Sequence, residues 1–137
     1  MAVEFEWEPL GVYTRFSGFI TANELVHSVE EIQSDTRFDD IRYVINDLLN
    51  VSGFELSAEA LTDVAILHHG GHRTSPYFKI VLISADGYLV KTIRNIHKFP
   101  HLASCQIEVF STVADARAWL KNWPDLNNAN NWKRLRF

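Results

Sequence analysis

Cysteine is almost missing from this chain of 137 residues, which has only Cys105. One cysteine excludes an internal disulfide and fits a reducing compartment, so we expect a cytoplasmic protein. Long apolar runs are also missing, and none reaches the roughly 18 residues that a membrane-spanning helix needs. The first residues, MAVEFEWEP, are acidic and alternating, which is unlike a secretory signal.

Positive charge is scarce, because 13 lysines and arginines stand against 17 aspartates and glutamates. The formal net charge of −4 argues against general nucleic-acid binding, which depends on neutralising phosphates. Hydrophobic residues make up 47% of the chain, whose length is that of one ordinary domain. A chain of this size can bury a core without disulfides or metal ions.

Two kinds of segment alternate along the chain: in one, every second residue is apolar, and in the other, apolar residues recur with the periodicity of a helix. Val3, Phe5 and Trp7 alternate with glutamates, which predicts a strand with one solvent-exposed face. The other predicted strands are 12–17, 42–48, 77–83 and 106–110, with a loop at 50–55. The predicted helices are 22–34, 58–69, 87–98 and 113–123. Residues typical of helix N-caps precede them: Thr21 with Glu24 as a capping box, then Ser57, Asp86 and Thr112.

The predicted order is β-β-α-β-α-β-α-β-α. It indicates a single α/β domain with a mostly parallel five-stranded sheet, an antiparallel N-terminal edge strand and four helices. We assign residues 1–126 to this domain. The tail, 127–137, carries Trp132, Leu135 and Phe137, and we expect it to pack on its own domain or on a second copy.

Three of the six histidines lie in the stretch AILHHGGHR, residues 65–73. His68 and His69 would occupy the last turn of the second predicted helix, where the helix dipole favours them, and Gly70-Gly71 is a natural left-handed C-terminal cap. His68 and His72 have the spacing of a zinc-binding helix, but two glycines interrupt it and no glutamate stands in the base position. We interpret the cluster as a helix end and expect no metal and no other cofactor. A metal-dependent activity using these histidines is the alternative.

Residues 43–64, YVINDLLNVSGFELSAEALTDV, combine a strand ending in Asp47, a short loop with Phe54 and a helix start at Ser57. This arrangement resembles the central signature of STAS domains, the anti-sigma-factor-antagonist fold. The stretches GVYTRFSGFITANEL, RFDDIRYVINDL and EVFSTVADARAWL resemble the SpoIIAA-like branch of uncharacterised bacterial proteins. That branch is similar in fold to STAS domains and to lipid-binding CRAL-TRIO domains. The resemblance covers roughly residues 10–122 and implies the same architecture.

The resemblance implies a non-enzymatic regulatory or interaction module that binds a protein partner or forms a homodimer. The surface expected to bind comprises Asp47, Phe54, Ser57, His68, His69 and His72. Asp47 would lie at the carboxyl end of a parallel strand, where open α/β sheets bind ligands, and its alternative role is to cap the following loop. Lys91 and Arg94 could receive an anionic group or an acidic partner, or form a solvated helix face.

Phosphorylated STAS antagonists carry serines at the turn that corresponds to residues 54–59. Ser57 is the only hydroxyl there in this chain. It can cap the helix, and a phosphate on it would be favoured at a helix N-terminus. Glu55 and Glu59 would repel that phosphate.

The second implied function is a carrier or sensor for a small apolar or lipid-like ligand. Its CRAL-TRIO-like pocket would lie between helices and sheet. The expected lining residues are Phe16, Phe54, Leu61, Ile93 and Trp119, and their alternative role is ordinary core packing.

Overall fold

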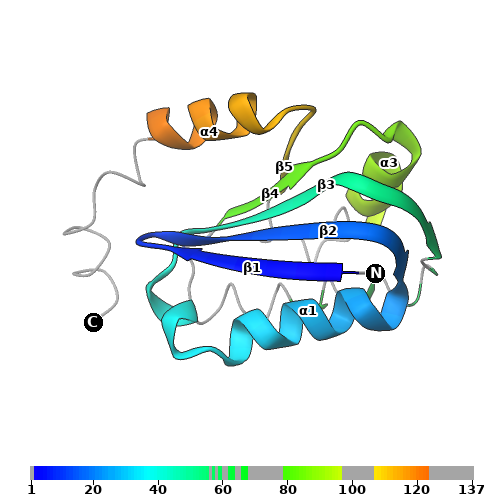
Figure 1. Ribbon diagram of the computed structural model, residues 1–137, viewed down its shortest axis with the longest axis horizontal. Coiled ribbons are helices and arrows are strands. Elements are labelled where there is room, and N and C mark those ends of the chain that lie inside the picture. Colours follow the sequence, from blue (N-terminus) through cyan, green and yellow to red (C-terminus); the bar gives the residue numbers. More distant parts are fainter. Residues whose placement is uncertain are drawn as a thin grey trace.

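A computed structural model describes residues 2–55, 57, 59, 62–63, 66–67, 79–96 and 107–123 of the chain (Figure 1). Five strands form one sheet in the order β1-β2-β3-β4-β5. They are β1 (Ala2–Glu8), β2 (Gly11–Thr21), β3 (Tyr43–Glu55), β4 (Lys79–Ile83) and β5 (Ile107–Phe110). β1 pairs antiparallel with β2, and the other neighbours pair in parallel. The predicted mixed sheet with an antiparallel N-terminal edge is confirmed.

The helices of the described residues are α1 (Ala22–Ser34), α3 (Gly87–Ile96) and α4 (Val113–Asn122), with a 3-10 helix, η1 (Thr36–Asp40), after α1. The N-caps of α1 and α4 are Thr21 and Thr112, each of which accepts from a backbone amide three residues later. Asp86 caps the start of α3 by accepting from the amides of Tyr88 and Leu89. These three predicted caps are therefore confirmed.

The second predicted helix, 58–69, lies mostly outside the described residues. Of this segment Glu59, Thr62, Asp63, Ile66 and Leu67 are helical. The side-chain amide of Gln33, on α1, donates to the carbonyl of Leu67 at 2.7 Å. This bond places the described part of the segment beside α1.

The two faces of the sheet are covered by different helices. On one face, Ile32 of α1 and Leu89 of α3 join core clusters that contain Val12 and Phe16 of β2. On the other face, Ala116 and Leu120 of α4 pack against a cluster of sheet residues: Tyr13, Tyr43, Ile45, Val81 and Ile83. Figure 1 shows α1 and α4 on opposite sides of the sheet. The alternation of side chains along β2 produces this division, because even positions face α1 and odd positions face α4.

β2 and β3 are longer than their sequence patterns predict. The predicted end of β2 at residue 17 and the predicted loop at 50–55 are both wrong, because the two strands remain paired as far as Thr21 and Glu55. Two irregularities in register interrupt this extension, and Gly18 adopts a left-handed backbone with φ of 80°. Bulges break the alternation on which strand prediction depends, since Leu49 and Asn50 are both exposed and Gly53 and Phe54 are both half-buried.

Candidate protein-interaction surface

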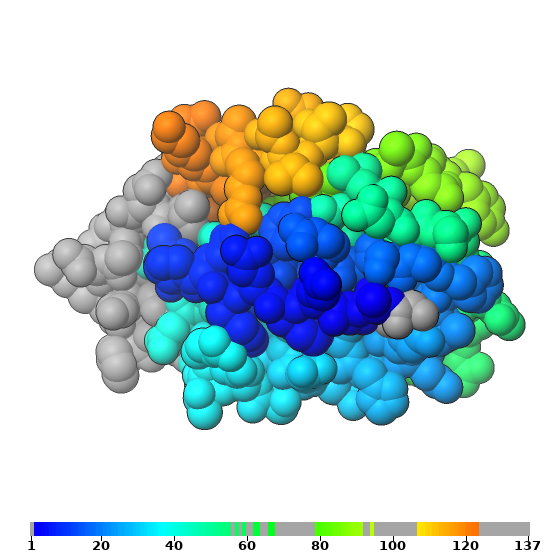
Figure 2. Space-filling model, in the orientation of Figure 1, coloured from blue at the N-terminus to red at the C-terminus, as the bar shows by residue number. Residues whose placement is uncertain are grey.

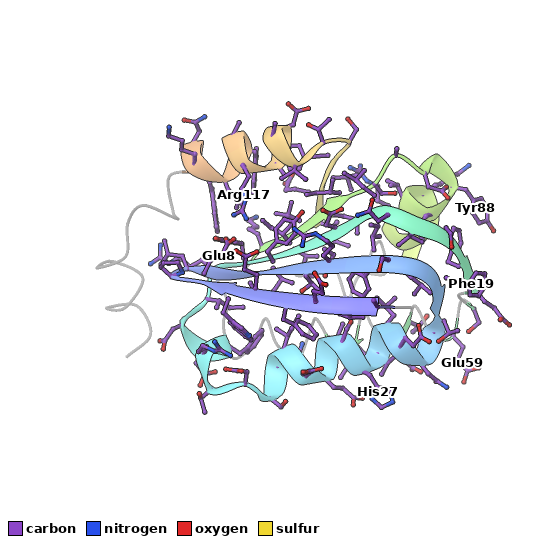
Figure 3. All side chains as sticks on the ribbon, in the orientation of Figure 1. Glu8, Phe19, His27, Glu59, Tyr88 and Arg117 are labelled. Carbon is purple, nitrogen blue, oxygen red and sulfur yellow. The ribbon has the colours of Figure 1, made fainter. Side chains whose placement is uncertain are left out.

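Aromatic side chains are exposed where β2 and β3 end. Phe19 is 48% exposed and Tyr88, in the first turn of α3, is 72% exposed. Figure 3 shows both side chains at the same end of the sheet, the end that carries the carboxyl termini of the parallel strands. Large aromatic residues exposed together in this way are typical of binding surfaces.

Local packing holds both rings in place. The ring of Tyr88 stacks on Phe54, with 6.1 Å between the ring centroids and 17° between the planes. Phe54 itself packs against the core cluster that contains Phe16 and Ile20. Phe19 lies over Gly53, its partner in the sheet, where an added Cβ would come within 3.1 Å of the Phe19 ring. Contacts within the folded domain therefore already restrict both rings. Little further side-chain conformational entropy is lost when a partner binds them.

A hollow lined mostly by polar residues lies where β2 and β3 end. It has a volume of about 260 Å³ and is lined by Thr21, Ala22, Asn23, Glu55 and Ser57. Ser57, which was predicted to take part in binding, is exposed. We call Phe19, Phe54, Ser57 and Tyr88, together with this hollow, the carboxyl-end surface.

Asp47 has a different position from the one predicted. It lies within β3, which continues to Glu55, so the expectation that a strand ends at Asp47 is wrong. Its side chain is buried, accepts from the Tyr13 hydroxyl and accepts from the backbone amide of Leu49 at 3.0 Å. Burial, followed by the bond to Asp47, raises the pKa of Tyr13 to about 12. The alternative role of Asp47 was to cap a following loop, but β3 continues past it and its bond to the Leu49 amide lies within the strand.

A second polar cluster joins α4 to the β1–β2 hairpin. The Arg117 guanidinium donates to both carboxylate oxygens of Glu8, at 2.7 Å and 2.5 Å, and the Tyr43 hydroxyl donates to the same carboxylate. The Arg117 bonds hold the pKa of Glu8 below its usual value, and the Glu8 bonds raise that of Arg117. Burial and the bond to Glu8 raise the pKa of Tyr43 to about 12. Figure 3 shows Glu8 and Arg117 at the end of the sheet opposite Phe19.

Two other predicted site residues lie on α3, the helix that carries Tyr88. Lys91 and Arg94 are exposed on α3. His68, His69 and His72 lie outside the described residues. Within the ranges that the structure describes, no three His, Cys, Asp or Glu side chains are grouped to hold a metal ion. None of the described helices is long and apolar enough to cross a membrane.

Two residues predicted to line one apolar pocket lie on opposite faces of the sheet. Phe16 is fully buried in the cluster that contacts α3, whereas Trp119 packs with the cluster beneath α4. Leu61 lies outside the described residues. The apolar-ligand function therefore stays a prediction, and within the described residues Phe16 has the core role that was its alternative.

Sequence reasoning missed Phe19, Tyr88 and the Glu8–Arg117 pair. Tyr88 lies two residues after the predicted N-cap, Asp86. Its place in the first turn of a helix could have indicated that its side chain is exposed. Phe19 carried no such signal, because the strand was expected to end before it. Glu8 and Arg117 are 109 residues apart, and only the folding of α4 onto the hairpin brings them together.

Comparisons with known proteins identify the fold. No family model and no curated protein matches the chain. The anti-sigma factor antagonist SpoIIAA in its unphosphorylated form is similar over 89% of this chain and 100% of its own, with 12% identity and a TM-score of 0.59. The phosphorylated form of the Bacillus cell fate determinant SpoIIAA is similar over 87% of this chain and 99% of its own, with 17% identity and a TM-score of 0.54.

An uncharacterized protein of the DUF3478 family with a SpoIIAA-like fold, from Shewanella loihica PV-4, is also similar. It matches 86% of this chain and 91% of its own, with 19% identity and a TM-score of 0.52. The order of strands and helices, the antiparallel first strand and these three structures lead to one conclusion: the chain has a STAS-domain-like fold of the SpoIIAA type.

Proposed function

We propose that this protein is a non-enzymatic regulatory module that binds a protein partner through the carboxyl-end surface. The observation that carries the proposal is the exposure of Phe19 and Tyr88 at one end of the sheet. A phenylalanine or tyrosine can bury about 150–250 Å², and aromatic residues supply much of the binding energy at protein interfaces. The similarity in fold to a protein described as an anti-sigma factor antagonist supports a regulatory role.

Ser57 is the residue of this surface that a kinase could modify. It is exposed in the polar hollow, and the residue after next, Glu59, is helical. One related structure is described as a phosphorylated form, which supports the idea. Glu55 lines the same hollow and would repel a negative charge at position 57, so we expect a Ser57→Glu variant to disturb the hollow and weaken partner binding. Equal binding by Ser57→Glu and Ser57→Ala would contradict this expectation.

Site-specific photo-crosslinking tests the proposed surface. A photoreactive phenylalanine analogue would replace Tyr88 in one variant and the exposed Glu30, on α1, in a control variant. In cells of the source organism we expect a discrete crosslinked product from position 88 and none from position 30. In a lysate, excess purified wild-type protein should compete for the partner and reduce the amount of crosslinked product. The same excess of a Phe19→Ser, Tyr88→Ala double variant should not reduce it. Equal crosslinking from both positions, or equal competition by the double variant, would refute the surface.

The alternative function, binding an apolar or lipid-like ligand, predicts a different result. Native mass spectrometry of the protein purified from cells would then show a retained ligand at one copy per chain. The same spectrum reports a bound metal ion or a homodimer. A retained lipid would replace the protein-interaction proposal.

A further inference from the structure

A groove runs between the edge strand β1 and helix α1. Its volume is about 190 Å³, and it is lined by Val3, Phe5, Glu24, His27, Ser28 and Glu31. Within the described part of the chain, β1 pairs only with β2, so its other edge presents unpaired backbone groups. Figure 2 shows β1, in dark blue, at the surface of the molecule. The edge and the groove together could accept one more extended segment.

The carboxylates around this edge favour the binding of a basic segment. Glu4 and Glu6 project from the side of β1 that faces away from the groove, and both are exposed. Glu24 and Glu31 stand on the groove side. A basic segment could pair with these four carboxylates from either side of the strand.

The chain itself carries a segment of matching composition. Residues 132–137 read WKRLRF and lie outside the described residues. In an extended conformation alternate side chains point to opposite sides, so Lys133, Leu135 and Phe137 share one side and Arg134 and Arg136 share the other. The first side matches the apolar floor of the groove and its carboxylates. The second side matches Glu4 and Glu6.

The length of the chain allows this segment to reach β1. α4 is followed by Trp123, whose ring lies 5.9 Å from the Lys79 ammonium, and Lys79 opens β4. β4 and β1 are three strand spacings apart, about 14 Å. Residues 124–131 can span about 26–29 Å when extended. Since Trp123 lies at the end of the sheet that contains Glu8, a segment arriving from there would run antiparallel to β1.

We propose that residues 132–137 dock on their own chain as a sixth strand, antiparallel to β1, with Leu135 and Phe137 in the groove over Val3 and Phe5. The same chain is the occupant because a short connection gives a tethered segment a millimolar effective concentration. Docking covers the exposed edge of β1. The glutamates of β1 would repel a second acidic strand, but they attract a basic one, so the charges of β1 favour pairing with residues 132–137.

Hydrogen exchange of the full chain, followed by mass spectrometry, tests the docking. In an antiparallel strand alternate amides face outward, so about half of the β1 amides exchange rapidly unless something pairs with them. We expect these amides to be protected in the wild-type chain. Exchange should become at least about fivefold faster in the Arg134→Glu, Arg136→Glu variant, because two cross-strand charge pairs become repulsive. Adding Glu6→Arg to that variant should restore part of the protection, and Glu4 is left unchanged because it pairs with Arg15 across the hairpin at 3.3 Å.

The controls separate docking from general effects. Lys91→Glu with Arg94→Glu makes the same change in net charge on α3 and should leave the exchange of β1 unchanged. The amides of residues 44–47 in β3 report whether each variant remains folded. The proposal is overturned if the outward amides of β1 are unprotected in the wild type, or if the Arg134 and Arg136 changes have no effect on them. Protection that appears only at concentrations where native mass spectrometry shows a dimer would assign the segment to a second copy and also overturn it.

Discussion

Replacing Gly11 with alanine tests how closely the β1–β2 hairpin packs against the central sheet. Gly11 is buried, and it pairs with Glu8 on one side and with Tyr43 on the other. A Cβ at this position would lie 2.5 Å from Cζ of Tyr43 and closer still to two other ring atoms. Carbon atoms prefer separations of about 3.5–4.0 Å, so the ring or the strand must move.

The Tyr43 ring has little freedom to move. It is 6% exposed, packs in the cluster beneath α4, and its hydroxyl donates to Glu8, which Arg117 also holds. Overpacking of this kind costs about 1–3 kcal/mol, and we expect Gly11→Ala to lower the free energy of unfolding by that amount. Urea denaturation followed by tryptophan fluorescence measures the change.

Gly87 provides the matched control. It is the first residue of α3, and nothing lies within 4 Å of a Cβ added there. Gly87→Ala should raise the free energy of unfolding by up to about 1 kcal/mol, because alanine restricts the unfolded chain. In a Tyr43→Ala background the cost of Gly11→Ala should disappear, since the opposing ring is gone. If Gly11→Ala is as well tolerated as Gly87→Ala, or equally costly without the ring, the steric argument is refuted.

Three further predictions concern the polar contacts. Arg117 lowers the pKa of Glu8, so its carboxylate stabilises the folded chain above the unfolded-state value near 4.5 and this contribution is lost as pH falls through the folded pKa. Glu8→Gln should therefore flatten the acid side of the stability profile measured by urea denaturation, and an unchanged slope would contradict the pairing. The pKa of Tyr43 is raised from 10.0 to about 12, so its contribution is complete below pH 10 and disappears as pH rises through 12. Tyr43→Phe should reduce the loss of stability across that alkaline interval, as followed by circular dichroism. Thr112→Ala should lower the free energy of unfolding by about 0.5–2 kcal/mol by removing the N-cap of α4, and Thr112→Ser should retain most of it.

Local rules predicted the helix starts and the order of the elements. Thr21, Asp86 and Thr112 act on amides two or three residues away, so their role depends on neighbours in sequence alone. For the predicted capping box, the hydrogen bonds of the described residues include the half in which the Glu24 amide donates to Thr21, but not the reciprocal bond to the Glu24 carboxylate.

The candidate surface was predicted only in part. Phe54 and Ser57 were placed at the carboxyl ends of the strands because parallel strands end at a common edge. Asp47 was assigned to the same edge, but pairing between β2 and β3 extends past it and buries its side chain. That extension depends on hydrogen bonds between two strands that α1 separates in sequence, which no local pattern contains.

Periodicity and capping act within a few residues, so local patterns were enough to predict the alternation of strands and helices, the antiparallel edge and three capping residues. They could not predict how far β2 and β3 run, that Asp47 binds Tyr13, that Arg117 binds Glu8 or that Phe19 and Tyr88 are exposed at one end. These features depend on interactions between distant parts of the chain. Strand pairing and the partly buried pair of Glu8 and Arg117 join residues far apart in the chain, and their geometry exists only after the helices have packed on the sheet.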